Sequence, residues 1–74
     1  MMNVHYSRKI ASDELMDTLF FATGQRVSKA KSPTNYTLSA GGFKVVIANS
    51  KNISVNGDKC RSIREAKYVI QELL

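Results

Sequence analysis

The chain has 74 residues, of which 43% are hydrophobic and 23% are charged. This length holds one compact domain, which buries roughly 60% of the surface that its unfolded chain exposes. The composition is that of a folded protein rather than a disordered tail. The longest apolar runs, Leu19–Ala22 and Val45–Ala48, are far shorter than the roughly 20 residues that span a bilayer. We therefore expect one folded domain without a transmembrane segment.

Charge, the amino-terminal sequence and cysteine content indicate the kind of partner and the cellular compartment to expect for this domain. Eleven Lys and Arg against six Asp and Glu leave a net charge of +5, which favours polyanionic partners but also serves solubility in small domains. Residues Met1–Ile10 lack the apolar stretch of a secretory signal. Cys60 is the only cysteine, so the chain has neither an intramolecular disulfide nor a multi-cysteine zinc site. We expect a cytoplasmic protein.

The amino-terminal third is predicted to contain an arm and a helix. Residues Met1–Ile10 follow neither the helical nor the strand period, so we expect an irregular arm ahead of a single domain over residues 11–74. Ser12, followed by two acidic residues, has the pattern of a helix N-cap. Apolar residues then recur at helical spacing: Leu15, Met16, Leu19, Phe20 and Phe21. Gly24 is a natural stop, so we expect about three turns of helix with this stripe in the core.

Short strand-like segments fill the middle of the chain. They are Arg26–Ala30, Tyr36–Ser39, Phe43–Ala48, Asn52–Val55 and Asp58–Cys60. The first of them is either a ragged edge strand or a loop. Gly41-Gly42 and Asn56-Gly57 predict tight hairpin turns. Alternation places apolar side chains on one inner face: Phe43, Val45, Ile47, Ile53 and Val55.

The closing helix has the clearest start. Ser62 and Glu65 form an S-x-x-E capping box, in which each side chain satisfies the other residue's backbone N–H, so the helix should begin at Ile63. An apolar stripe follows: Ala66, Val69, Ile70, Leu73 and Leu74. The residues expected to face away are Arg64, Lys67 and Gln71. The predicted fold is α+β, with a helix, three to four short antiparallel strands and a helix, both helices lying on one face of the sheet.

The sequence offers no constellation of catalytic or metal-binding residues. The only histidine, His5, lies in the expected arm, and the carboxylates are explained by helix starts, a turn and an exposed helix end. No helix and no Lys-Ser/Thr pair follows Gly41-Gly42, so it is not a phosphate loop. Cys60, which stands between Lys59 and Arg61, is either a thiol with a lowered pKa or a small residue packed at a strand end. We expect a non-enzymatic protein without a cofactor or a metal.

The segment around the start of the closing helix resembles a known motif. An Asn-Gly turn, a short strand and a serine precede the residues Arg64, Ala66 and Lys67 of SIREAK. This order resembles the carboxy-terminal half of double-stranded-RNA-binding domains, which end in a strand, a serine-capped helix and a K-K-x-A-K type motif. In that motif the three residues take the places of a basic residue, the alanine and the last lysine.

The resemblance covers residues 43–74 in motif and residues 12–74 in the order of elements. Phe43 stands at a family-like distance upstream, and Tyr36 matches the tyrosine of the family's first strand. The loop after that strand is only AGG here, whereas the family's loop is longer and enters a minor groove. The resemblance therefore implies a topology rather than a ligand.

Basic residues converge near the start of the closing helix, where free backbone N–H groups and the helix dipole favour anions. The candidate nucleic-acid-binding residues are Lys59, Arg61, Arg64, Lys67, Lys44, Lys51 and Tyr68. Arg26, Lys29 and Lys31 extend this patch if the fold brings them to the same side. Tyr68 is better placed for base stacking than Tyr6 or Tyr36, because the three Phe are expected in the core. The alternative is that a helix facing water simply carries charges.

Two functions from different classes follow from these observations. The first is a module that contacts the backbone of DNA or RNA with little reading of the bases. The second is a small modulator, of the kind that phages and mobile elements often encode, that covers the surface of a partner protein. For the second, the edge strand near Arg26–Ala30 is a surface on which another chain can pair. Steep salt dependence of binding to DNA or RNA separates the two.

Overall fold

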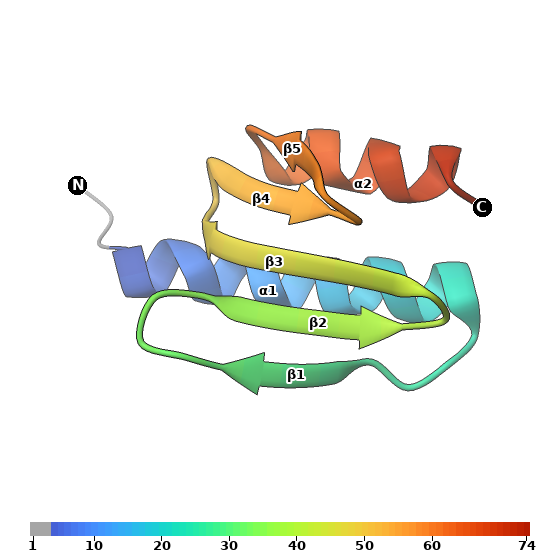
Figure 1. Ribbon diagram of the computed structural model, residues 1–74, viewed down its shortest axis with the longest axis horizontal. Coiled ribbons are helices and arrows are strands. Elements are labelled where there is room, and N and C mark those ends of the chain that lie inside the picture. The colour runs from blue at the N-terminus through green and yellow to red at the C-terminus, as the bar shows by residue number, and fades with distance from the viewer. Residues whose placement is uncertain (1–3) are drawn as a thin grey trace.

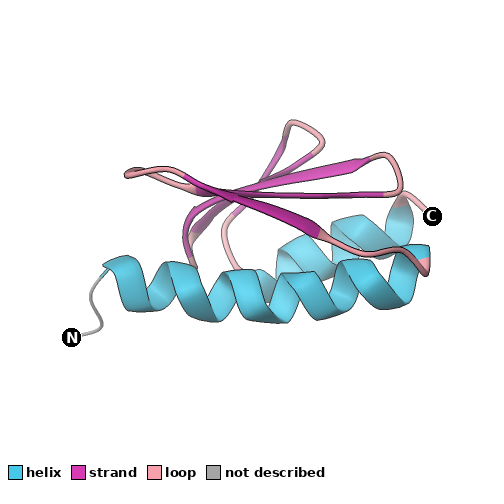
Figure 2. Ribbon diagram, turned by 90° about the horizontal axis from the view of Figure 1, so that it is seen from below, coloured by secondary structure: helices cyan, strands magenta, loops and turns pink. Residues whose placement is uncertain are grey.

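The computed structural model describes residues 4–74, with side chains from residue 6 onward, and shows a two-layer α+β domain. In chain order the elements are α1 Val4–Thr23, β1 Ser28–Lys31, β2 Tyr36–Ala40, β3 Phe43–Asn49, β4 Asn52–Val55, β5 Asp58–Cys60 and α2 Ile63–Glu72 (Figure 1). The strands form one antiparallel sheet in the order β1-β2-β3-β4-β5. Both helices cover one face of the sheet and leave the other face open (Figure 2). The predicted fold is confirmed, with five strands instead of three to four.

Helix α1 starts earlier than predicted. Residues 4–10, expected as an irregular arm, are helical, and residues 1–3 of that arm lie outside the described residues. The buried side chains of α1 are Ser7, Arg8, Ala11, Ser12, Leu15 and Leu19. Ser12 is thus a fully buried residue within the helix, and its prediction as the N-cap was wrong. The buried face keeps the helical period, but polar and charged residues occupy half of it, so an apolar count does not detect it.

The other end of α1 is held by two glycines. Gly24 has a φ of +67°, and its N–H donates to the Phe20 carbonyl oxygen at 2.8 Å, which confirms the predicted stop. Gly41, in the β2–β3 turn, packs closely against Thr23. A Cβ added at Gly41 would lie only 2.8 Å from the Thr23 Cγ2 atom, so a larger residue does not fit there without a shift. The carboxyl end of α1 and the β2–β3 turn therefore lie together.

Two-residue turns connect the inner hairpins. Gly41-Gly42 joins β2 to β3, and Asn56-Gly57 joins β4 to β5. All four turn residues have positive φ, as a type I′ hairpin requires, so both predicted turns are confirmed. The edge strand β1 begins at Ser28, two residues later than predicted, and β2 and β3 each extend one residue beyond their predicted ends.

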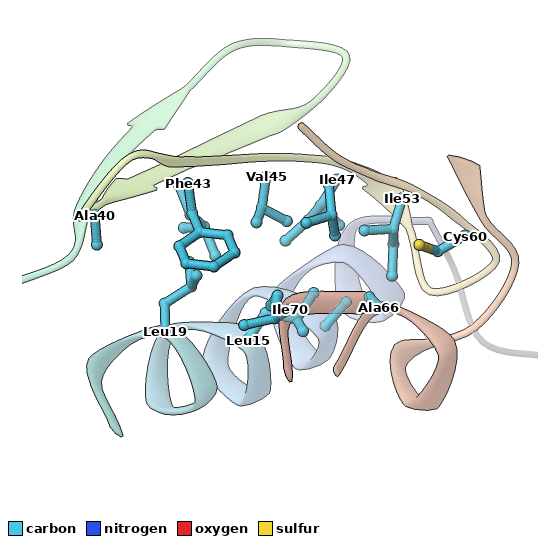
Figure 3. Packing of buried hydrophobic residues seen from close by; sticks show 13 residues of the cluster. Leu15, Leu19, Ala40, Phe43, Val45, Ile47, Ile53, Cys60, Ala66 and Ile70 are labelled. Atoms are coloured by element: carbon cyan, nitrogen blue, oxygen red, sulfur yellow. The ribbon is translucent and has the colours of Figure 1, made fainter. Parts of the chain in front are cut away.

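The core lies between the sheet and the helices (Figure 3). Its largest fully buried apolar side chains are Leu15, Leu19, Leu38, Val45, Ile47, Ile53, Val55 and Ile70. Phe43 is also buried, as predicted, but Phe20 and Phe21 are 52% and 84% exposed, so their prediction as core residues was wrong. The stripe of α2 is also shorter than predicted, because Leu73 and Leu74 are exposed.

The start of α2 is confirmed at Ile63. The Ser62 Oγ accepts a hydrogen bond from the Glu65 N–H at 3.0 Å. The Glu65 carboxylate accepts from the N–H of Arg61 at 3.1 Å, rather than from that of Ser62. Both side chains therefore accept a backbone N–H, as in a capping box. The Glu65 carboxylate, however, accepts the N–H of the residue before the N-cap rather than that of the N-cap itself.

Candidate functional site

The antiparallel sheet gathers three connections at one of its ends. These are the β1–β2 loop, the β3–β4 turn and the β5–α2 connection (Figure 1). The amino-terminal part of α1 lies at the same end, because Arg8 Nε donates to the Ala48 carbonyl oxygen at 2.8 Å. The two helices run in the same direction (Figures 1 and 2), so the positive ends of both dipoles point toward this end.

Basic side chains from α1, β1, the β3–β4 turn, β5 and the β5–α2 connection lie toward this end. We call this part of the molecule the basic end, which consists of Arg8, Lys29, Lys31, Lys51, Lys59 and Arg61. They form two clusters, one around Tyr36 and one beside the start of α2. The strands β2 and β5, which carry Tyr36 and Lys59, are three strand spacings apart, about 14 Å.

The first cluster surrounds the ring of Tyr36. The distances to the ring centroid are 5.5 Å from Arg8 Cζ, 4.7 Å from Lys29 Nζ and 5.6 Å from Lys31 Nζ. The register explains this arrangement, because Lys31 pairs with Tyr36 across β1 and β2, and Lys29 is two residues away on the same face. The negative face of an aromatic ring attracts cations, so a single ring holds all three groups.

This cluster carries uncompensated positive charge. Arg8 is only 4% exposed, and its guanidinium is held by the carbonyl oxygens of Ala48 and Pro33 rather than by a carboxylate. Within the described part of the chain, Arg8, Lys29 and Lys31 form no ion pair. Like charges gathered around one ring repel one another, and the repulsion is stronger near a protein surface than in bulk water. A bound anion would offset this repulsion by attracting each of the cations.

The second cluster lines an open hollow beside the start of α2. Lys51, Lys59 and Arg61 surround it together with Asn52, Cys60 and Glu65. The hollow therefore has three cations and one carboxylate, and that carboxylate accepts the backbone N–H of Arg61. Lys59 pairs across the sheet with Ser54 and so also borders the open sheet face. The convergence predicted near the start of the closing helix is present for these three residues.

Four other predicted residues lie apart from the two clusters or are already paired. Lys44 is at the opposite end of β3, where its N–H donates to Asn56 Oδ1 at 2.7 Å. Lys67 faces α1, with its Nζ 3.7 Å from a Glu14 carboxylate oxygen. Arg64 is exposed in the first turn of α2, and Tyr68, one turn later, is 63% exposed. Both lie on the side of α2 opposite the buried face, so the structure does not join them to the hollow.

The three residues expected to extend the patch do not join the hollow beside α2. Lys29 and Lys31 belong to the basic end through Tyr36, whereas Arg26 lines a different hollow with Met16, Asp17, Phe20 and Val27. Sequence reasoning missed Arg8 because it lies in the segment predicted as an arm. A signal was present, since Ser7, Ala11 and Leu15 continue the helical period through that segment.

The Cys60 thiol is a packed core group. Its side chain is 2% exposed, and its Sγ lies 3.6 Å from the Asp58 carbonyl oxygen. Burial, and then the carboxylates of Glu65 and Asp58, raise the pKa of this thiol above its ordinary value. The structure thus supports the small packed residue at a strand end, not the thiol with a lowered pKa.

Comparison with known proteins found no matching family model, no matching curated protein and no matching solved structure. Among the described residues, no three His, Cys, Asp or Glu side chains are grouped so that they could hold a metal ion. The side chain of His5 lies outside the described residues. No helix in the described part of the chain is long and apolar enough to cross a membrane.

Proposed function

We propose that this chain is a non-enzymatic protein that binds the sugar-phosphate backbone of a nucleic acid through its basic end. The observation that carries the proposal is the cluster of Arg8, Lys29 and Lys31 around Tyr36, which has no ion-pairing carboxylate among the described residues. Phosphates supply the missing negative charge. The hollow beside α2 adds a second set of cations at the same end of the sheet.

The chemistry of both clusters favours phosphates over bases. Lysine and arginine heads are the main partners of phosphate oxygens, and such contacts position a protein without reading sequence. The ring of Tyr36 is already contacted by three cations, which leaves it poorly placed for stacking on a base. With about 14 Å between the strands that carry them, the clusters reach separate phosphates. Binding should therefore tolerate changes of sequence and weaken steeply with salt.

The test compares two variants that remove the same charge from opposite ends. Lys29→Gln/Lys31→Gln neutralises the two lysines around Tyr36, and Lys44→Gln/Arg26→Gln is the matched control away from the basic end. Each is titrated with labelled duplex RNA, duplex DNA and single strands at two salt concentrations. Duplex RNA is included because of the resemblance of residues 43–74 to duplex-RNA-binding domains.

We expect Lys29→Gln/Lys31→Gln to weaken binding and to lower the salt slope by roughly one to two units. The control should retain most of the affinity, because its charges lie far from the bound phosphates. Absence of binding by the wild type at about 50 mM salt would contradict the proposal. Equal losses in the two variants would also contradict it, because they would show attraction by net charge alone.

A modulator that covers a partner protein is the second candidate function. It is favoured by the exposed rings of Phe20 and Phe21. The edge strand β1 offers less support than expected, because its Lys29 and Lys31 oppose the addition of another strand. Absence of nucleic-acid binding by the wild type in the titration would favour this second function over the first.

A further inference from the structure

Two adjacent aromatic rings project from α1 at the end of the molecule opposite the basic end. The Phe20 and Phe21 centroids are 5.9 Å apart with an interplanar angle of 78°, so the rings pack edge to face. Phe21 is 84% exposed and Phe20 is 52% exposed. This pair forms an exposed ridge that the packing of the domain itself does not require.

The ridge has a hollow on each side. Phe21 borders a hollow lined by Thr18, Ala22, Gln71 and Leu74, between the carboxyl ends of the two helices. Phe20 borders another hollow, which contains the charged residues Asp17 and Arg26. Among the described residues, no charged side chain lines the first hollow, so it suits a phenyl ring better than the second. We call the ridge and this first hollow the apolar end.

A projecting ring beside a recess on one surface is self-complementary. When a two-fold axis relates two copies, the ring of each enters the recess of the other, and the contact closes as a dimer. The charge distribution permits this pairing, because the basic end lies away from the apolar end in a molecule 34 Å long. Two copies that meet at their apolar ends hold their basic clusters farther apart than the roughly 8 Å over which salt screens charges.

We propose that the apolar end is a contact with a second copy of this chain, in which Phe21 of each copy enters the hollow between Ala22 and Leu74 of the other. The contact is small, so the dimer should be weak and form at high protein concentration. Its two basic ends would point away from each other. The contact does not depend on the proposed nucleic-acid binding, and its test needs no nucleic acid.

Sedimentation measures the association of the full chain from about 10 µM to 1 mM protein, at about 0.05 and 0.5 M salt. The variant is Phe21→Ser, and the matched control is Tyr68→Ser, which removes another exposed ring from outside the apolar end. Circular dichroism reports whether each variant is folded. We expect both to be folded, because the two exposed rings contribute little to the core.

We expect wild type and Tyr68→Ser to dimerise alike, and Phe21→Ser to raise the dissociation constant at least about tenfold. High salt should preserve or strengthen the dimer, since the contact is apolar and screening reduces repulsion between the two positively charged copies. A wild type that stays monomeric at every concentration would overturn the proposal and leave the apolar end to another partner. A Phe21→Ser chain that dimerises like wild type, or a wild type that assembles beyond dimers, would overturn it as well.

Discussion

Ser7 and Ser50 bind each other twice across 43 positions of sequence. The Ser7 Oγ donates to the Ser50 Oγ at 2.7 Å and accepts from the Ser50 N–H at 2.8 Å. This pair ties the start of α1 to the β3–β4 turn, which carries Lys51 of the basic end. The segment that the sequence predicted as an arm is therefore part of the frame that positions the candidate site.

Removing this link should destabilise the domain. Ser7→Ala loses both hydrogen bonds and leaves the partly buried Ser50 N–H without its partner, so the free energy of unfolding should fall by about 1–3 kcal/mol. Urea denaturation measures the change. Ser28→Ala, an exposed position in β1, is the control and should change stability by less than about 0.5 kcal/mol. Equal stability of the two variants would show that the Ser7–Ser50 link does not stabilise the domain.

Ser12 provides a test of where α1 begins. Its Oγ is fully buried and has no hydrogen-bond partner among the described residues. Ser12→Ala removes an unsatisfied polar group and raises helix propensity, so it should stabilise the protein by roughly 0.5–1 kcal/mol. Ser62→Ala, which removes a real N-cap, should instead cost about 1 kcal/mol. If both Ser12→Ala and Ser62→Ala lower the free energy of unfolding, Ser12 acts as an N-cap and not as a buried residue within α1.

The two ends of the α2 stripe should respond differently to truncation. Ile70 is fully buried against the sheet, so Ile70→Ala should cost about 2–5 kcal/mol of unfolding free energy. Leu73 is 48% exposed at the end of the helix, and Leu73→Ala should cost less than about 1 kcal/mol. Thermal and urea denaturation give both values. Similar losses would mean that α2 buries its whole apolar stripe.

Cys60 should be protected from alkylation in the folded protein. Because burial raises its pKa, the thiolate that reacts is scarcer than in an ordinary cysteine and is also covered. We expect slow modification by a thiol reagent near pH 8 and a sharp rise in rate across the denaturation transition. Fast modification in the native state would indicate that β5 and the start of α2 open readily.

The elements that the sequence predicted well have local signals. Asn56-Gly57 and Gly41-Gly42 adopt the positive φ that glycine and asparagine tolerate, and the cap at Ser62 depends on residues three positions apart. In β3 the buried residues Phe43, Val45 and Ile47 alternate with the less buried Lys44 and Val46, because one face of the strand meets the core.

The errors arose where burial and residue type disagree. Arg8 and Ser12 occupy the buried face of α1, so their polarity concealed the helix, and Phe20 and Phe21 lie outside the core although they are aromatic. The grouping of the site depends on tertiary structure, which places Lys31 and Lys51 at one end and Lys44 at the other. No local pattern in one sequence contains that information.

The central claim is that phosphates bind at the basic end, and an NMR titration of the ¹⁵N-labelled chain with a short oligonucleotide tests it most directly. The account predicts that the amide signals around Tyr36, Lys51 and Arg61 shift most, that those around Gly42 and Lys44 stay nearly unchanged, and that the shifts decrease as salt is added. Largest shifts at Gly42 and Lys44, or no shifts at about 50 mM salt, would contradict it.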